Sequence, residues 1–131
     1  GGRLAQAQTL FGAATVISAE VPDVAFIHVD TADAAGNGVV RGPLGEIVLA
    51  AQAASAVVLV AEELVGTDAV LAAGVTIPGI LVDAVVCHPG AVAPDGAIGR
   101  YDRDVPAYAD YSARSRTSEG FAQWLAEVID R

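Results

Sequence analysis

Three short, mostly apolar runs, each followed within two residues by a charged residue or a histidine, constrain the fold of this chain most strongly. They span residues 24–29, 56–60 and 80–86. Near-continuous apolar runs are typical of strands in parallel sheets, where helices cover both faces. Helical patterns at residues 44–55 and 68–73 separate the runs. The order strand, helix, strand, helix, strand predicts an α/β fold with an open, mostly parallel sheet and flanking helices.

Polar residues gather at the carboxyl end of each predicted strand. Right-handed crossovers align parallel strands, so these ends meet at one edge of the sheet. Ligands of open α/β proteins bind at that edge. The sequence therefore predicts a candidate site from a loop, an acidic pair and a histidine: His28, Asp30, Asp33, Gly36, Asn37, Glu62, Glu63 and His88.

The acidic pair and the two histidines have the side chains most suited to catalysis. Glu62 or Glu63 could act as a nucleophile or as a general acid and base, and the alternative, which we favour, is pairing with an arginine of a nearby loop. His28 and His88 could act as a general base or a ligand, but we expect each to bond a neighbouring carboxylate or carbonyl. Two histidines without ordered ligand spacing predict no metal site.

Asp33, Gly36 and Asn37 have the composition of a tight turn. Asp and Asn side chains hydrogen-bond their own backbone in turns, and Gly adopts positive φ without strain. We therefore predict a structural turn, which is compatible with a role in shaping the edge of a substrate site.

Two further residues lie in or beside the third apolar run. Asp83 interrupts the run, and a buried carboxylate needs a partner, so we expect Arg41, Arg100, a backbone N–H group or water to face it. Cys87 ends the run without a basic neighbour in the sequence, which predicts a small buried residue rather than a reactive thiol.

Turns and caps divide the rest of the chain. We expect a short β run at residues 15–17, a cap on the 68–73 helix by Thr67, and a turn at Pro78-Gly79. A helix should begin at Asp104. The last helix, residues 118–130, carries an apolar stripe that we expect to be core: Phe121, Trp124, Leu125, Val128 and Ile129.

Composition excludes several classes of partner. The net charge of −9 argues against nucleic acid and anionic membrane surfaces, and no apolar run approaches the length of a membrane span. The single cysteine, Cys87, allows no internal disulfide, which fits a reducing cytoplasm. The chain lacks Met and begins Gly1-Gly2-Arg3, so we expect a fragment or a processed product.

Four motifs occur in an order and at a spacing that resemble one enzyme family. Ala-Asp-x-x-Gly-Asn, Glu-Glu, Pro-Gly-x-x-Val-Asp and His-Pro-Gly-Ala occupy residues 32–37, 62–63, 78–83 and 88–91. Over about residues 20–115 the chain resembles the second half of the α subunit of family I CoA-transferases, of the glutaconate CoA-transferase type. Residues 1–131 would then form a single α/β domain or the C-terminal part of one.

The resemblance implies a cytoplasmic subunit that acts with a β subunit on an acyl-CoA and a carboxylic acid. A glutamate of such enzymes attacks the acyl-CoA and forms a glutamyl-CoA thioester, and in glutaconate-type enzymes it belongs to the β subunit. The residue that performs covalent catalysis is therefore expected outside this chain. Asp33, Gly36, Asn37 and His88 would border the site of the coenzyme A thioester, which is a substrate rather than a bound cofactor.

The resemblance leaves two alternatives open. Family α subunits are about twice this long, because one core needs all strands of the sheet, so the chain alone is not expected to be competent. A related branch of the family opens rings of CoA thioesters by hydrolysis during steroid-ring degradation. The chain could also be a non-catalytic truncated or structural half-domain, with exposed apolar surface where the other half would pack.

Overall fold

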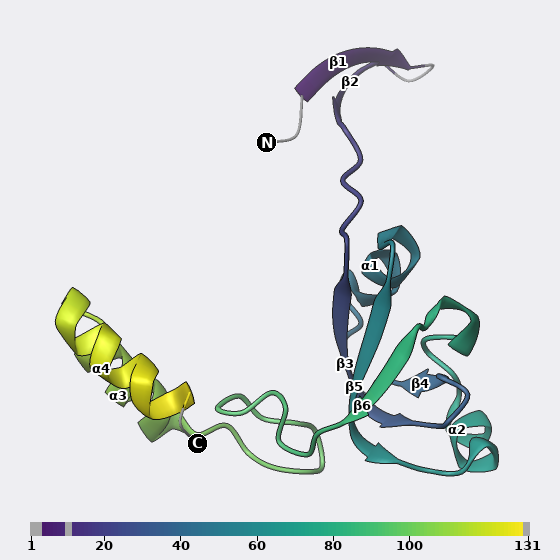
Figure 1. Cartoon of the computed structure of the whole chain (residues 1–131). Helices are drawn as coiled ribbons and strands as arrows, with labels where there is room; N and C mark the ends of the chain where they lie inside the picture. Colours follow the sequence, from purple (N-terminus) through teal and green to yellow (C-terminus); the bar gives the residue numbers. More distant parts are fainter. Residues whose placement is uncertain (1–3, 10–11, 130–131) are drawn as a thin grey trace. The chain divides into compact units, whose positions relative to one another are not determined.

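The computed structural model describes residues 4–9 and 12–129, which form two compact units (Figure 1). The first unit ends at His88 and the second begins at Pro89. None of the helices in the described ranges is long and apolar enough to cross a membrane.

A four-stranded sheet is the main element of the first unit. Its strands are β3 (Ala25–Ala32), β4 (Gly38–Val39), β5 (Val57–Leu64) and β6 (Ala84–Cys87), in the order β4-β3-β5-β6. β3, β5 and β6 are parallel, and β4 is antiparallel to β3. The predicted α/β fold with a mostly parallel sheet is confirmed.

Short helices connect the parallel strands. They are α1 (Ile47–Ala53), α2 (Thr67–Ala73) and a 3-10 helix at Gly79–Leu81. The α1 helix begins three residues later than predicted, after Gly45, whose φ of +51° lies outside the helical region. The predicted cap at Thr67 is wrong, because Gly66 is the N-cap and Thr67 already belongs to the helix.

An antiparallel hairpin precedes the sheet in the sequence. It consists of β1 (Leu4–Thr9) and β2 (Gly12–Ile17), with Leu4 opposite Ile17 and Thr9 opposite Gly12. The β run predicted at residues 15–17 lies in β2, whereas β1 carries no apolar run that predicts a strand.

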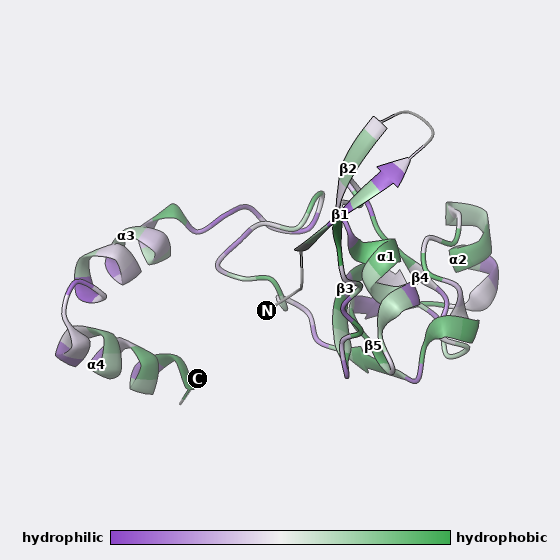
Figure 2. Cartoon of the chain, turned by 90° about the horizontal axis from the view of Figure 1, so that it is seen from above, coloured by the Kyte–Doolittle hydropathy of each residue, from purple (hydrophilic) through white to green (hydrophobic). Residues whose placement is uncertain are grey.

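The core lies on one face of the sheet. Val29 and Leu59 are fully buried there, together with Ala51 of α1 and Ile77. In Figure 1, α1 and α2 lie on the same side of the β3-β5-β6 sheet, and Figure 2 shows the hydrophobic colouring of α1 and β3. Gly38 of β4 packs so closely on its neighbours that a Cβ there would lie 2.9 Å from Leu59 Cδ1.

The other face of the sheet is largely open. Side chains alternate along a strand, so Phe26 and His28 point away from the face that Val29 occupies. Phe26 is 74% exposed and Val86 is 49% exposed. The expected exposed apolar surface is therefore present on this face.

Two predicted strand ends are displaced in the structure. β3 continues through Asp30 and Thr31, and β5 continues through Glu62 and Glu63, because these residues pair across the sheet, with Thr31 opposite Glu63. The polar residues thus belong to the strands rather than to loops that follow them.

The third predicted strand is shorter than expected. Residues 79–81 form the 3-10 helix, and β6 begins only at Ala84, so Asp83 precedes the strand and is exposed. The Asp83 carboxylate accepts a hydrogen bond from the backbone N–H of Val57 at 2.8 Å, which is one of the partners expected for it. Cys87 is exposed, so its predicted burial is wrong: β6 is an edge strand with a neighbour on one side only.

The second unit contains two helices, α3 (Val105–Arg114) and α4 (Ser118–Ile129). The helix predicted to begin at Asp104 is present, and Asp104 is its N-cap, with a side chain that accepts a hydrogen bond from the N–H of Ala107. The apolar stripe of α4 is not core, because no described residue of α4 is buried and Ile129 is 72% exposed. A hairpin of two helices offers only one packing partner for such a stripe.

Replacing Gly79 by Ala tests the close contact between the 3-10 helix and the turn after β3. A Cβ at this position would collide with the carbonyl oxygen of Ala35. We expect a loss of about 1–3 kcal/mol in the free energy of unfolding, as in other overpacked sites, measured by urea denaturation.

Gly66→Ala is the matched control, because a Cβ there meets no atom within 4 Å and the φ of −67° suits alanine. It should cost less than about 1 kcal/mol, the usual effect of alanine at an N-cap. Equal losses in the two variants would contradict the contact.

Candidate functional site at the sheet

His28 and Glu62 form an ion pair between neighbouring strands. The Nε2 atom of His28 lies 2.9 Å from Oε1 of Glu62, within hydrogen-bond distance. The Glu62 side chain is 2% exposed and the His28 side chain 28% exposed. The prediction that a histidine bonds a neighbouring carboxylate is therefore confirmed for His28, and this carboxylate is Glu62.

The register of β3 and β5 produces this pair. His28 lies opposite Val60, and Glu62 follows Val60 by two residues, so the alternation of side chains places Glu62 on the same face as His28. This is the open face of the sheet. Glu63 points to the opposite side of its strand from Glu62 and is exposed.

Asp33 organises the turn that links β3 to β4. Its Oδ1 accepts hydrogen bonds from the N–H groups of Ala35 and Asn37, and its Oδ2 accepts one from Nδ2 of Asn37, all at 2.9 Å. Gly36 in this turn has a φ of +84°, which suits glycine alone. The predicted structural turn of Asp33, Gly36 and Asn37 is confirmed.

These hydrogen bonds stabilise the ionised form of Asp33. The side-chain bond from Asn37 lowers the pKa of Asp33 below its ordinary value of 3.8, whereas burial acts in the opposite direction. Backbone bonds from Asn37 and Ala35, and a side-chain bond from Thr67, also lower this pKa. Asp33 is fully buried, so these bonds replace the water that its charge has lost.

The turn is held against the segment that precedes β6. Oδ1 of Asn37 accepts a hydrogen bond from the N–H of Gly79 at 3.0 Å. A Cβ at Gly36 would lie 3.2 Å from Cβ of Val82, and Val82 packs against the covered core. The turn therefore ties the end of β3 to residues that lie far away in the sequence.

The predicted site residues consequently fall into two groups. His28 and Glu62 meet on the open face, whereas Asp33, Gly36 and Asn37 pack with the 3-10 helix that contributes to the covered face. His88 is exposed, and its backbone N–H donates to the carbonyl of Ala61, the residue before Glu62, at 2.8 Å.

The partners of two polar residues, buried Asp30 and half-buried Thr76, could not be identified from the sequence. Asp30 is 3% exposed, and its carboxylate accepts a hydrogen bond from the backbone N–H of Arg41. Thr76 accepts a hydrogen bond from the N–H of Val40 at 3.1 Å. The only sequence signal for either contact is a polar residue inside or beside an apolar run, which does not identify its partner.

The described residues contain no group of three or more His, Cys, Asp or Glu side chains that could hold a metal ion. The open face presents the imidazole of His28 beside the buried carboxylate of Glu62. Such a pair can accept, hold or deliver a proton.

The chain resembles known proteins over most of its length. Residues 6–88 match the family model described as "Coenzyme A transferase". The A subunit of 3-oxoadipate CoA-transferase from Pseudomonas knackmussii is 36% identical over 82% of this chain and 38% of the relative. The A subunit of glutaconate CoA-transferase from Acidaminococcus fermentans is 32% identical over 88% of this chain and 38% of the relative.

Solved structures give the same result. Glutaconate CoA-transferase from Acidaminococcus fermentans matches with a TM-score of 0.88 at 28% identity, over 95% of this chain and 41% of that one. A variant of the decarboxylase AibA/AibB matches with a TM-score of 0.79 at 31% identity, over 98% and 47%. The chain thus spans less than half the length of the relatives and structures that it matches.

The lowered pKa of Asp33 predicts a stability that depends on acid pH. Above the ordinary pKa of 3.8 the ionised carboxylate contributes fully, and the contribution is lost as the pH falls through the lower pKa of the folded state. Thermal unfolding between pH 7 and pH 2 should show the melting temperature falling below about pH 4.

Asp33→Asn should remove part of this acid dependence and lower stability at pH 7 by about 1–3 kcal/mol, since an amide donor then faces Nδ2 of Asn37. Asp23→Asn, at an exposed aspartate, is the control and should behave like the parent chain. An unchanged melting temperature in Asp33→Asn would contradict the role of this carboxylate.

Proposed function

Since this chain belongs to the coenzyme A transferase family, we propose that it is part of the α subunit of an enzyme that moves coenzyme A between an acyl-CoA and a carboxylic acid. The observation that carries the proposal is the family match over residues 6–88, which includes the whole parallel sheet and the Asp33 turn. Because the chain spans less than half of its relatives, the activity is proposed for the whole α subunit together with a partner β subunit.

The proposed reaction exchanges one thioester for another. An acyl-CoA and an acceptor carboxylate become a free carboxylate and a new acyl-CoA, so no net water or electron is consumed. We assign the glutamate that carries coenzyme A between the two acids to the β subunit, as the sequence resemblance implies. Such covalent catalysis divides one difficult transfer into easier steps.

The open face of the sheet is the part of this chain that we assign to the substrate. Buried Glu62 holds the partly exposed imidazole of His28 in one orientation, which prepares the ring to donate a hydrogen bond or a proton. His88 follows the neighbouring strand and would border the same site. The turn of Asp33, Gly36 and Asn37 would shape its edge by holding the end of β3.

A cytoplasmic location is part of the same proposal, because acyl-CoA thioesters are the expected substrates. The single cysteine, Cys87, is an exposed free thiol in the structure, which is compatible with a reducing compartment.

A hydrolase of the same fold is the second candidate. The match to a decarboxylase, AibA/AibB, supports a fold that accommodates reactions other than transfer. Ring-opening hydrolysis of a CoA thioester would use water in place of the acceptor acid. The His28–Glu62 pair would suit it, because an imidazole can activate water as a general base.

Product analysis separates these reactions. The whole α subunit, co-purified with its β subunit, is incubated with an acyl-CoA and an acceptor acid, and thioesters are identified by mass spectrometry. We expect a new acyl-CoA that depends on the acceptor. Free coenzyme A formed without acceptor would favour the hydrolase, a thioester one CO₂ lighter would favour a decarboxylase, and no turnover with any CoA thioester would favour a non-catalytic half-domain.

The His28–Glu62 pair predicts a specific loss of activity. In the assembled enzyme, Glu62→Gln keeps a hydrogen-bond acceptor for His28 but removes the charge, and His28→Gln removes the imidazole. We expect kcat to fall by about 10²–10⁴-fold for His28→Gln, the usual contribution of general acid–base catalysis, with altered pH dependence in Glu62→Gln.

Glu63→Gln is the matched control, because Glu63 is the adjacent residue of the same strand and points to the opposite side. Its kcat should stay within about twofold of the parent value, as expected for a group outside the reaction. Full activity of His28→Gln, or a large loss in Glu63→Gln alone, would overturn the assignment.

A further inference from the structure

Arg41 is the only Arg or Lys residue in the described part of the first unit, which carries many more carboxylates than that. It is exposed. Arg41 is one of the partners expected for Asp83, but Asp83 accepts the backbone N–H of Val57 instead. Within the part of the chain that the structure describes, the guanidinium of Arg41 forms no hydrogen bond or ion pair. Its charge is therefore available to a ligand.

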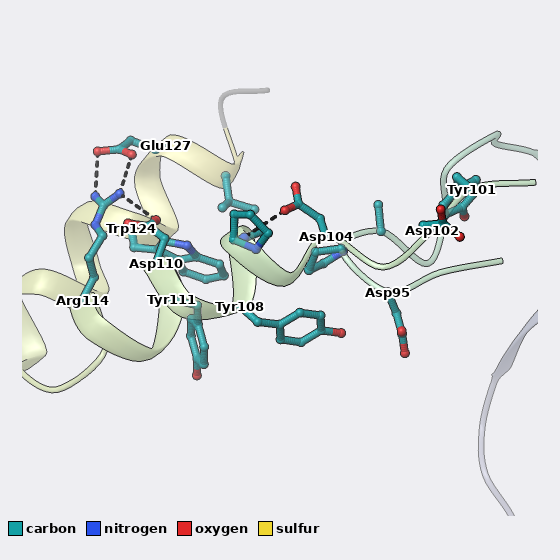
Figure 3. A pocket seen from close by; sticks show the side chains of 15 residues that line it. Asp95, Tyr101, Asp102, Asp104, Tyr108, Asp110, Tyr111, Arg114, Trp124 and Glu127 are labelled. Carbon is teal, nitrogen blue, oxygen red and sulfur yellow. Dashed lines mark hydrogen bonds and ion pairs between the residues drawn. The ribbon is translucent and has the colours of Figure 1, made fainter.

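Arginines of the second unit show what a structural role looks like. Arg114 donates two hydrogen bonds of 2.7 Å to Glu127, as Figure 3 shows. Arg103 also forms an ion pair within its own unit. Arg116 is exposed and, among the described residues, has no side-chain partner. An unpaired guanidinium alone therefore does not identify a site, and the backbone of Arg41 supplies the second observation.

Two consecutive hydrogen bonds hold the backbone at Arg41. The N–H of Val40 donates to Oγ1 of Thr76 at 3.1 Å. The N–H of Arg41 donates to the carboxylate of Asp30, a residue that is only 3% exposed. A charged side chain on a fixed backbone is preorganised for a ligand, because less conformational freedom is lost on binding.

Asp30 holds Arg41 beside the His28–Glu62 pair. Asp30 follows His28 by two residues in β3, so the two side chains share a face of the strand and lie about 7 Å apart along it. The register of β3 and β5 puts Asp30 opposite Glu62. An arginine side chain is long enough to span this distance, so the guanidinium of Arg41 can reach a substrate that contacts the imidazole of His28.

The proposed reaction brings an anion to this face of the sheet. Its acid substrates are carboxylates, and the net charge of −9 together with the carboxylates of Asp30 and Glu62 repels them. A planar guanidinium binds a carboxylate through two parallel N–H bonds. The phosphates of coenzyme A are separated from its thiol by the whole pantetheine arm, so a thioester at His28 would place them well beyond Arg41.

We propose that Arg41 binds the second carboxylate of a dicarboxylic acid substrate, an assignment that rests on the proposed function. The carboxylate that reacts loses its charge when the thioester forms, whereas a second carboxylate stays ionised throughout the exchange. Arg41 is then a specificity-determining residue, which makes the enzyme prefer dicarboxylic acids to monocarboxylic acids of the same length.

The test compares acceptor acids of equal length: butyrate with succinate, and valerate with glutarate. It uses the whole α subunit assembled with its β subunit and the acyl-CoA donor that gives the most turnover in the product analysis. We expect the parent enzyme to prefer the dicarboxylic acid of each pair. Arg41→Gln should raise KM for the dicarboxylic acids by about 10–100-fold, the usual cost of losing a charge-assisted hydrogen-bonded pair. KM for the monocarboxylic acids should stay within about twofold.

Two further variants complete the comparison. Arg41→Lys keeps the charge but not the planar fork, so it should restore part of the loss. Arg116→Gln is the matched control, because it removes another exposed arginine without a described partner, and it should change KM by less than about twofold. A fall in kcat for both series of acids in Arg41→Gln, with KM unchanged, would show a structural role and overturn the assignment.

The remaining outcomes are equally distinct. An equal rise in KM for both series would assign the guanidinium to the reacting carboxylate, and a rise in KM for the acyl-CoA alone would assign it to a phosphate of coenzyme A; both overturn the proposal. A parent enzyme that does not prefer dicarboxylic acids also overturns it while leaving the proposed function intact. Absence of thioester exchange with any acid contradicts the proposed function itself.

Discussion

The parallel pairing of β3 with β5 is the constraint on which the first unit depends. It places Ile27 opposite Leu59 and Val29 opposite Ala61, so one face of both strands is apolar and buried. The same register brings His28 and Glu62 together on the other face. A shift of one residue would turn the apolar set toward solvent and separate the pair, so core packing and site geometry are determined together.

The two faces of this sheet have different roles. Connecting segments cover one face, and the buried Asp33 turn attaches them to the end of β3 through Asn37 and Gly79. The other face keeps Phe26 and Val86 exposed beside an ion pair whose carboxylate is buried. The covered side therefore supports the strands that carry the oriented polar pair on the open side.

Local sequence patterns predicted which segments form strands and turns better than they predicted where each strand ends or which strand lies at the edge of the sheet. The apolar runs identified the parallel strands, and Asp33, Gly36 and Asn37 identified their turn, because turn chemistry acts over a few residues. The predicted end of the second strand, before Glu62, and the predicted start of the third, at Ile80, were wrong. The length of a strand depends on its pairing with the neighbouring strand, which the sequence does not show. The prediction that Cys87 is buried was wrong, because the sequence does not show that its strand lies at the edge of the sheet.

The sequence by itself determined the α/β class, the Asp33 turn and the resemblance to CoA-transferases, since each depends on residue types at short spacing. Only the tertiary structure decided that Glu62 rather than Glu63 faces His28, and that the turn and the pair serve opposite faces of the sheet. It also decided that no described residue of α4 is buried, although the helix carries an apolar stripe. These outcomes depend on strand register and on which segments pack together, and contacts between distant residues leave no periodic signal in the chain.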